Sequence, residues 1–138
     1  MLDTGAVGRP WLSVITVVRD DDLGLTRTIS SLQRQSFDGV EFIVVDGSSD
    51  RERVKNCLVD AGIKSRYSWD EPRGIYPAMN RGLEVATGKF TYFANAGDEL
   101  FAGDVFSRTR EFVSESDWAF VNFMTSCRIN SCKSSLQE

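Results

Sequence analysis

Short apolar runs alternate with amphipathic segments along most of this chain. The run at residues 11–18 is rich in β-branched side chains, and the segment after it repeats Leu25, Ile29 and Leu32 at helical spacing. Strands are expected at residues 11–18, 40–45, 64–69, 90–94 and 118–124. Because strands that alternate with helices form a mostly parallel sheet covered on both faces, the pattern predicts an α/β fold.

Local signals place the helices between these strands. Asp50 is expected to cap the second helix, Gly62 to end it, and Pro77 to lie in the first turn of the third helix. The residues expected to face the core are Val54, Leu58 and Ala61 in the second helix, Met79, Leu83 and Ala86 in the third, and Val105, Phe106, Thr109, Phe112 and Val113 in the fourth. Residues 11–124 are therefore expected to form one domain, between a flexible leader at residues 1–10 and an irregular, polar tail at residues 125–138.

Composition and charge exclude several classes of protein. The net charge of −4 argues against a nucleic-acid-binding protein, which needs a basic patch or stripe. No apolar run is long enough to span a membrane, and the first residues do not resemble a signal peptide. Three cysteines and no histidine predict neither a disulfide framework nor a zinc site. We expect a cytoplasmic protein, and peripheral association with the inner face of the membrane stays open.

Two carboxylates follow predicted strands at positions where open α/β sheets bind ligands. Asp46 follows the second strand, either as a turn residue or as a hydrogen-bond acceptor for a base or ribose. Asp98 follows the fourth strand, in a loop with Asn95 and Glu99, either as a solvated turn residue or as a ligand of a hard cation. The residues alone leave both alternatives open.

Six segments in order give the chain a resemblance to a known family. They are LSVITVV, the acidic start of the first helix, VVDGSSD, GIYPAMNRG, ATGKF and FANAGD. The chain resembles the family 2 glycosyltransferases of GT-A fold, over roughly residues 11–121. This resemblance implies a Rossmann-like, mostly parallel sheet. It also implies transfer of a sugar from a nucleotide diphosphate sugar to a hydroxyl acceptor, in glycan, glycolipid or cell-wall biosynthesis.

The resemblance also implies roles for individual residues. Val17 and Arg19 would line the nucleobase pocket, and Asp46 would accept a hydrogen bond from the base. The helix start from Gly74 to Asn80 would approach the ribose and diphosphate, with Asn95 on the neighbouring loop. Asp98 would hold a divalent metal, Mg²⁺ or Mn²⁺, on the diphosphate. These residues together describe the donor half of a transferase.

The chain departs from the family pattern at three places. The metal loop has Asn95 where many relatives carry an acid, so that only Asp98 remains of the motif. Pro72 stands where relatives have an acid two residues before the glycine, and Pro77 replaces a common aspartate. These departures weaken the expected metal affinity and the ribose or phosphate contacts near Pro72.

We expect the chain to be truncated at its C-terminus relative to such an enzyme, and we assign no catalytic base. One alternative is therefore a non-catalytic relative that binds nucleotide or a partner protein. Trp118, Phe120 and Phe123 would be exposed by truncation, which predicts self-association. A signalling receiver domain is a poor alternative, because its phosphorylated aspartate ends the third strand whereas Asp46 ends the second. A dinucleotide-binding fold lacks its glycine motif here.

Overall fold

A computed structural model describes residues 8–113 of the chain. Within them, four parallel strands lie in the order β3-β2-β1-β4 and alternate with helices along the chain. The strands are β1 (Leu12–Val18), β2 (Val40–Asp46), β3 (Arg66–Trp69) and β4 (Phe90–Phe93). The helices are α1 (Asp22–Gln33), α2 (Arg51–Ala61), α3 (Ile75–Val85) and α4 (Val105–Val113). The predicted α/β fold with a parallel sheet is confirmed.

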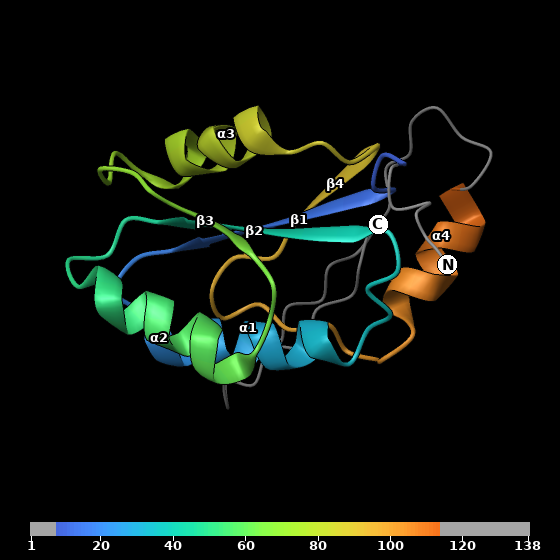
Figure 1. The fold of residues 1–138 in the computed structure, drawn as a ribbon, viewed down its shortest axis with the longest axis horizontal. Coiled ribbons are helices and arrows are strands. Elements are labelled where there is room, and N and C mark those ends of the chain that lie inside the picture. Colours follow the sequence, from blue (N-terminus) through green and yellow to red (C-terminus); the bar gives the residue numbers. More distant parts are fainter. Residues whose placement is uncertain (1–7, 114–138) are drawn as a thin grey trace, which may run out of the picture.

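Helices cover both faces of the sheet, as predicted. Figure 1 shows α1 and α2 on one face, α3 on the other, and α4 beyond the amino ends of the strands. Along β1, Val14 and Val18 pack in the core with α1 and α2, whereas Ile15 faces α3. Because both faces of the central strands are buried, β1 and β2 are apolar almost throughout.

The predicted helix ends are found in the structure. The Asp50 carboxylate accepts hydrogen bonds from the backbone N–H groups of Glu52 and Arg53 at 3.1 and 3.4 Å. Gly62 ends α2 in the left-handed conformation, with φ of 66°. These local signals are reliable because each involves atoms only a few residues apart.

The predicted inner faces are correct for α1 and α2 but only partly for α3 and α4. Leu83 in α3 is 45% exposed and Phe112 in α4 is 77% exposed, so both predictions are wrong. Helix α3 faces the sheet through Ala78, Gly82 and Val85, a stripe that lies one residue away from the predicted one. Sequence periodicity missed it because the glycine in its centre has no apolar side chain.

A partly buried carboxylate, that of Glu41, organises the amino end of the sheet. One Glu41 oxygen, Oε1, accepts hydrogen bonds from Ser13 Oγ, from Gly88 N and from both the N–H and hydroxyl of Thr87, at 2.5–3.2 Å. The other, Oε2, pairs with Arg66 at 3.4 Å. Glu41 thereby joins β1, β2, β3 and the turn between α3 and β4. The ATG segment at residues 86–88, which is part of the family resemblance, therefore has a structural role in this network.

Several predictions fall on residues 1–7 and 114–138, outside the described residues. They include the strand at residues 118–124, the irregular tail, and the apolar side chains expected to cause self-association. The domain boundary at residue 124 also lies there, and the domain bounds 11–124 stay a prediction. No described helix has the length and apolar character needed to cross a bilayer.

Candidate functional site

A hollow of about 260 Å³ lies where the carboxyl ends of β1, β2 and β4 meet the start of α3. Four of the seven residues predicted from the sequence line it: Val17, Arg19, Gly74 and Asn95. Parallel strands bring their carboxyl ends to one edge of a sheet, which is why loops far apart in the sequence meet here. A larger hollow of about 650 Å³ lies at the opposite end of β2.

Three predicted residues do not line the hollow: Asp46, Asn80 and Asp98. Asn80 lies on an exposed position of α3. Asp46 is fully buried, and its Oδ1 accepts a hydrogen bond from Ser48 N at 2.8 Å. Its Oδ2 accepts one from the Tyr67 hydroxyl at 2.6 Å. In this conformation the Asp46 carboxylate is not accessible to a ligand.

Asp98 belongs to a tightly held loop directly after β4. Its Oδ2 accepts a hydrogen bond from Asn95 N at 3.0 Å, and its own N–H donates to Asn95 O at 2.8 Å. Thr28 of α1 holds the loop from beneath, because its hydroxyl donates to Asp98 O and accepts from Gly97 N. The surrounding protein desolvates the Asp98 carboxyl and raises its pKa, although the hydrogen bond from Asn95 opposes that shift. The loop thus fixes one carboxylate beside the hollow.

The same loop carries a buried oxygen without a partner. Asn95 Oδ1 is buried, makes no hydrogen bond, and belongs to a side chain that lines the hollow. A buried oxygen without a partner usually indicates an ion, water or ligand that completes its hydrogen bonding or coordination. Asn95 and Asp98 therefore provide an amide oxygen and a carboxylate, both of which are ligands that Mg²⁺ and related cations prefer.

The charges that line the hollow are mostly negative. Three carboxylates, those of Asp21, Asp70 and Glu71, stand against the single guanidinium of Arg19. Asp21 was not predicted from the sequence as a site residue, and it belongs to the acidic start of the first helix, where its carboxylate accepts from Gly24 N at 2.9 Å. An anionic ligand in this hollow would therefore need additional positive charge. A bound cation is the simplest source of it.

The residues described here do not form a metal site by themselves. No group of three or more His, Cys, Asp or Glu side chains in residues 8–113 could hold an ion. Mg²⁺ commonly binds one or two carboxylates and completes its shell with substrate phosphates and water. Asp98 and Asn95 fit a metal of that kind, which would bind together with a phosphorylated ligand.

Close packing at Gly82 sets the position of α3, whose first turn borders the hollow. A Cβ at Gly82 would lie 2.4 Å from Cγ2 of the fully buried Ile15 on β1. Gly82→Ala is therefore expected to push α3 off the sheet and to cost about 1–3 kcal/mol, the usual cost of overpacking. Chemical denaturation measures this cost. Gly62→Ala is a useful comparison, because no atom lies within 4 Å of the added Cβ and its cost comes only from alanine in a left-handed conformation. An unchanged stability in Gly82→Ala would contradict this packing.

The chain is similar to known proteins in sequence and in fold. A family model described as "Glycosyl transferase family 2" matches residues 13–125. A PGL/p-HBAD biosynthesis glycosyltransferase from Mycobacterium bovis is 31% identical over 111 residues, which cover 78% of this chain and 43% of the relative. The chain therefore spans less than half the length of that curated relative.

Two solved structures share the fold. The mannosyltransferase PcManGT from Pyrobaculum calidifontis, in complex with GDP-Man and Mn²⁺, superimposes with a TM-score of 0.69 at 22% identity, over 79% of this chain and 34% of that chain. S. aureus TarS 1-349 in complex with UDP-GlcNAc gives a TM-score of 0.62 at 21% identity, over 75% of this chain and 31% of that chain. At these identities the likeness shows the fold.

Proposed function

This chain belongs to glycosyl transferase family 2 and has the GT-A fold, and from that premise we propose that its hollow binds the nucleotide diphosphate part of a sugar donor. The single observation that carries the proposal is the meeting of Arg19, the first turn of α3 and the Asn95–Asp98 loop at one edge of the sheet. The reaction would transfer the sugar to a hydroxyl group of an acceptor. The non-catalytic alternative is not favoured by the relatives, which are named as glycosyltransferases.

Arg19 is the residue best suited to hold phosphate. Arg19 lines the hollow, and within residues 8–113 its side chain forms no hydrogen bond or salt bridge. The N-terminus of α3 lies on the opposite wall, with no side chain capping it. Free backbone N–H groups and the helix dipole at such an end favour phosphate. We therefore assign the diphosphate to the space between Arg19 and Gly74.

Asp98 and Asn95 would hold the divalent metal. When bound, the metal would neutralise negative charge that develops on the leaving diphosphate. The protein's own contribution is to fix these two ligands: Thr28 and the Asn95 backbone hold the loop before any ligand arrives. Three carboxylates around the hollow repel an uncompensated diphosphate, which makes binding depend on the cation.

We assign the nucleobase to the end of the hollow that is lined by Val17 and Gly47, where β1 and β2 end. Asp46 lies directly beneath that end but is buried, so we assign it an indirect role there. We assign no catalytic base, sugar or acceptor. A cytoplasmic location with peripheral contact to the inner face of the membrane stays a prediction from the sequence.

Ligand-dependent thermal stability tests the proposal. UDP or GDP with Mn²⁺ is expected to raise the melting temperature, since a ligand at 100 times its Kd stabilises the folded state by about 2.7 kcal/mol. Uridine or guanosine with Mn²⁺ controls for the diphosphate, and inorganic phosphate with Mn²⁺ controls for the base. The proposal fails if neither diphosphate raises the melting temperature. Stabilisation without sugar transfer to any hydroxyl acceptor would favour the non-catalytic alternative.

A further inference from the structure

Ser48 connects three strand ends through its own polar atoms. Its N–H donates to Asp46 Oδ1 at 2.8 Å, its Oγ accepts from Asp20 N at 2.8 Å, and its carbonyl accepts from Trp69 Nε1 at 3.1 Å. The residue is only 3% exposed. The loops after β1, β2 and β3 are therefore held in one arrangement by a single small side chain and its backbone.

The loop after β1 needs this support because its backbone is strained. Asp20 has φ of 52° and is the one non-glycine residue with positive φ in the described part of the chain. This left-handed conformation costs free energy in any residue with a Cβ, although aspartate adopts it more readily than most. Strained residues of this kind persist where neighbouring contacts hold them, and they gather at functional sites.

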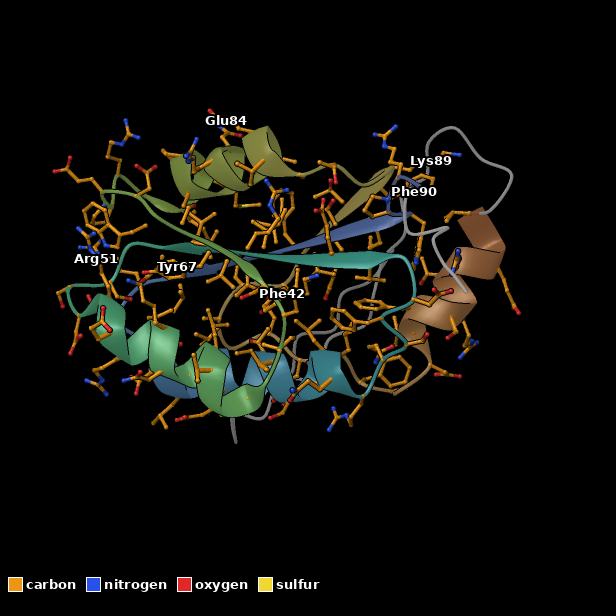
Figure 2. The ribbon with its side chains drawn as sticks, viewed as in Figure 1. Phe42, Arg51, Tyr67, Glu84, Lys89 and Phe90 are labelled. Carbon is orange, nitrogen blue, oxygen red and sulfur yellow. The ribbon has the colours of Figure 1, made fainter. Side chains whose placement is uncertain are left out.

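Three contacts hold Asp20 in place. Besides the bond from Asp20 N to Ser48 Oγ, the Asp20 carboxylate accepts from both the N–H and the hydroxyl of Ser49, at 2.9 and 2.8 Å. All three contacts come from the loop after β2. Ser48 is held in turn by Asp46, whose second oxygen is fixed by Tyr67. Figure 2 shows Tyr67 near Arg51 at this end of the molecule.

The neighbours of Asp20 on each side, Arg19 and Asp21, both line the hollow. A left-handed residue reverses the local course of the backbone, so its φ decides where the flanking side chains lie. If Asp20 left this conformation, Arg19 and Asp21 would no longer lie on the wall of the hollow together. The buried contacts of Ser48 thus determine the placement of one arginine and one carboxylate at the site.

We propose that Asp46 and Ser48 are positioning residues that hold Asp20 in its left-handed conformation and so aim Arg19 and Asp21 into the donor site. The proposal rests on the proposed function, because it concerns the affinity of the same hollow for a nucleoside diphosphate. It gives Asp46 a role through Ser48 and Asp20 in place of a direct contact with the base.

Ser48→Ala tests the proposal, and Ser13→Ala is its matched control. Both serines are buried, and each Oγ accepts from a backbone N–H at 2.8 Å, but Ser13 does so from Gly88 at the amino end of the sheet. Isothermal titration with UDP and with GDP, each with Mn²⁺, is expected to show roughly tenfold weaker binding in Ser48→Ala, as the strained conformation loses its support. Ser13→Ala should lower the melting temperature and leave Kd within about twofold.

The Asp20→Gly background shows whether Ser48→Ala weakens binding through the conformation of residue 20 or through a general loss of stability. Glycine adopts positive φ without strain, so the Asp20→Gly chain should need Ser48 much less. In that background Ser48→Ala is expected to weaken nucleotide binding by only about twofold. An equal loss of affinity in both backgrounds, an unchanged Kd in Ser48→Ala, or an equal loss in Ser13→Ala would each overturn the proposal.

Amide hydrogen exchange tests whether Ser48 holds the loop after β1 without depending on nucleotide binding. The Asp20 amide is expected to be protected in the wild-type chain and to exchange faster in Ser48→Ala, without any ligand. If the wild-type chain binds neither nucleotide, the proposed function fails and the exchange result still decides whether Ser48 holds the loop. An unprotected Asp20 amide in the wild-type chain would refute that contact.

Discussion

Replacing Glu41 with alanine is expected to lower the free energy of unfolding by roughly 1–3 kcal/mol, the cost of leaving hydrogen-bond donors without their acceptor. The substitution leaves Ser13, Thr87 and Gly88 without their shared acceptor and removes the partner of Arg66. Gly88 N keeps the Ser13 hydroxyl as an acceptor at 2.8 Å, so the loss falls mainly on Ser13 and Thr87. Chemical denaturation of both proteins measures the difference directly.

Two further variants show whether the network, and not carboxylate loss in general, causes this effect. Glu41→Gln keeps an acceptor oxygen for the four hydrogen bonds to Oε1 and should cost less than Glu41→Ala. Glu84→Ala removes an exposed glutamate that pairs with Arg81 on the outer side of α3 (Figure 2), and it should change stability by at most about 0.5 kcal/mol. Similar losses in Glu84→Ala and Glu41→Ala would contradict the network.

The effect of Glu41 should depend on pH. Burial favours the protonated form, but hydrogen bonds from Ser13, Thr87 and Arg66 outweigh it and lower the pKa of Glu41 below its usual 4.5. A lowered folded-state pKa gives stability that is fully present above the unfolded-state value and is lost as pH falls through the folded-state value. The stability difference between the wild-type and Glu41→Gln chains should therefore shrink as pH drops below about 4.5. A constant difference at all pH values would contradict this.

Replacing Asp98 with alanine is expected to remove the metal-dependent part of nucleotide binding. We expect binding of UDP or GDP in Mn²⁺ to weaken by at least about tenfold, because the loop then keeps only the Asn95 amide as a metal ligand. Binding measured with EDTA should be the same in both chains. Asp104→Ala is the matched control, since Asp104 is an exposed carboxylate that directly precedes α4 and does not line the hollow.

The raised pKa of Asp98 gives this prediction a pH dependence. Desolvation raises the pKa of its carboxyl, and a carboxyl must be deprotonated to bind a metal. Metal-dependent binding should therefore weaken at a higher pH than it would with an ordinary aspartate as ligand. If Asp98→Ala retains its full response to Mn²⁺, then Asp98 does not hold the metal and the Asn95–Asp98 loop has another role.

The sequence predicted the layers of the fold and the edge of the sheet that carries the site. Alternating strands and helices specify a parallel sheet, and such a sheet gathers the loops that follow its strands at one edge. Val17, Arg19, Gly74 and Asn95 meet around the hollow for that reason, and their roles in binding stay predictions. Capping residues such as Asp50 could also be recognised, since a cap and its hydrogen-bond donors are only a few residues apart.

The site residues that sequence reasoning missed depend on contacts between distant segments. Asp21, Asp70 and Glu71 come together only because the loops after β1 and β3 border the same hollow. The signal that points to Asp21 is the acidic run directly after the first strand, which is also typical of the start of a helix. Capping does account for one Asp21 oxygen, but the residue also lines the hollow.

What the sequence by itself determined is therefore the order of strands and helices, their ends, and the loops that meet. Hydrophobic periodicity and helix capping depend on residues that are close together in the sequence, so both can be recognised from the sequence alone. Only the tertiary structure decided which stripe of α3 faces the sheet, because Gly82 packs through the absence of a side chain. It also decided that Asp46 is buried with its carboxylate bonded to Tyr67, because burial and the partners of a carboxylate depend on strands that are distant in sequence.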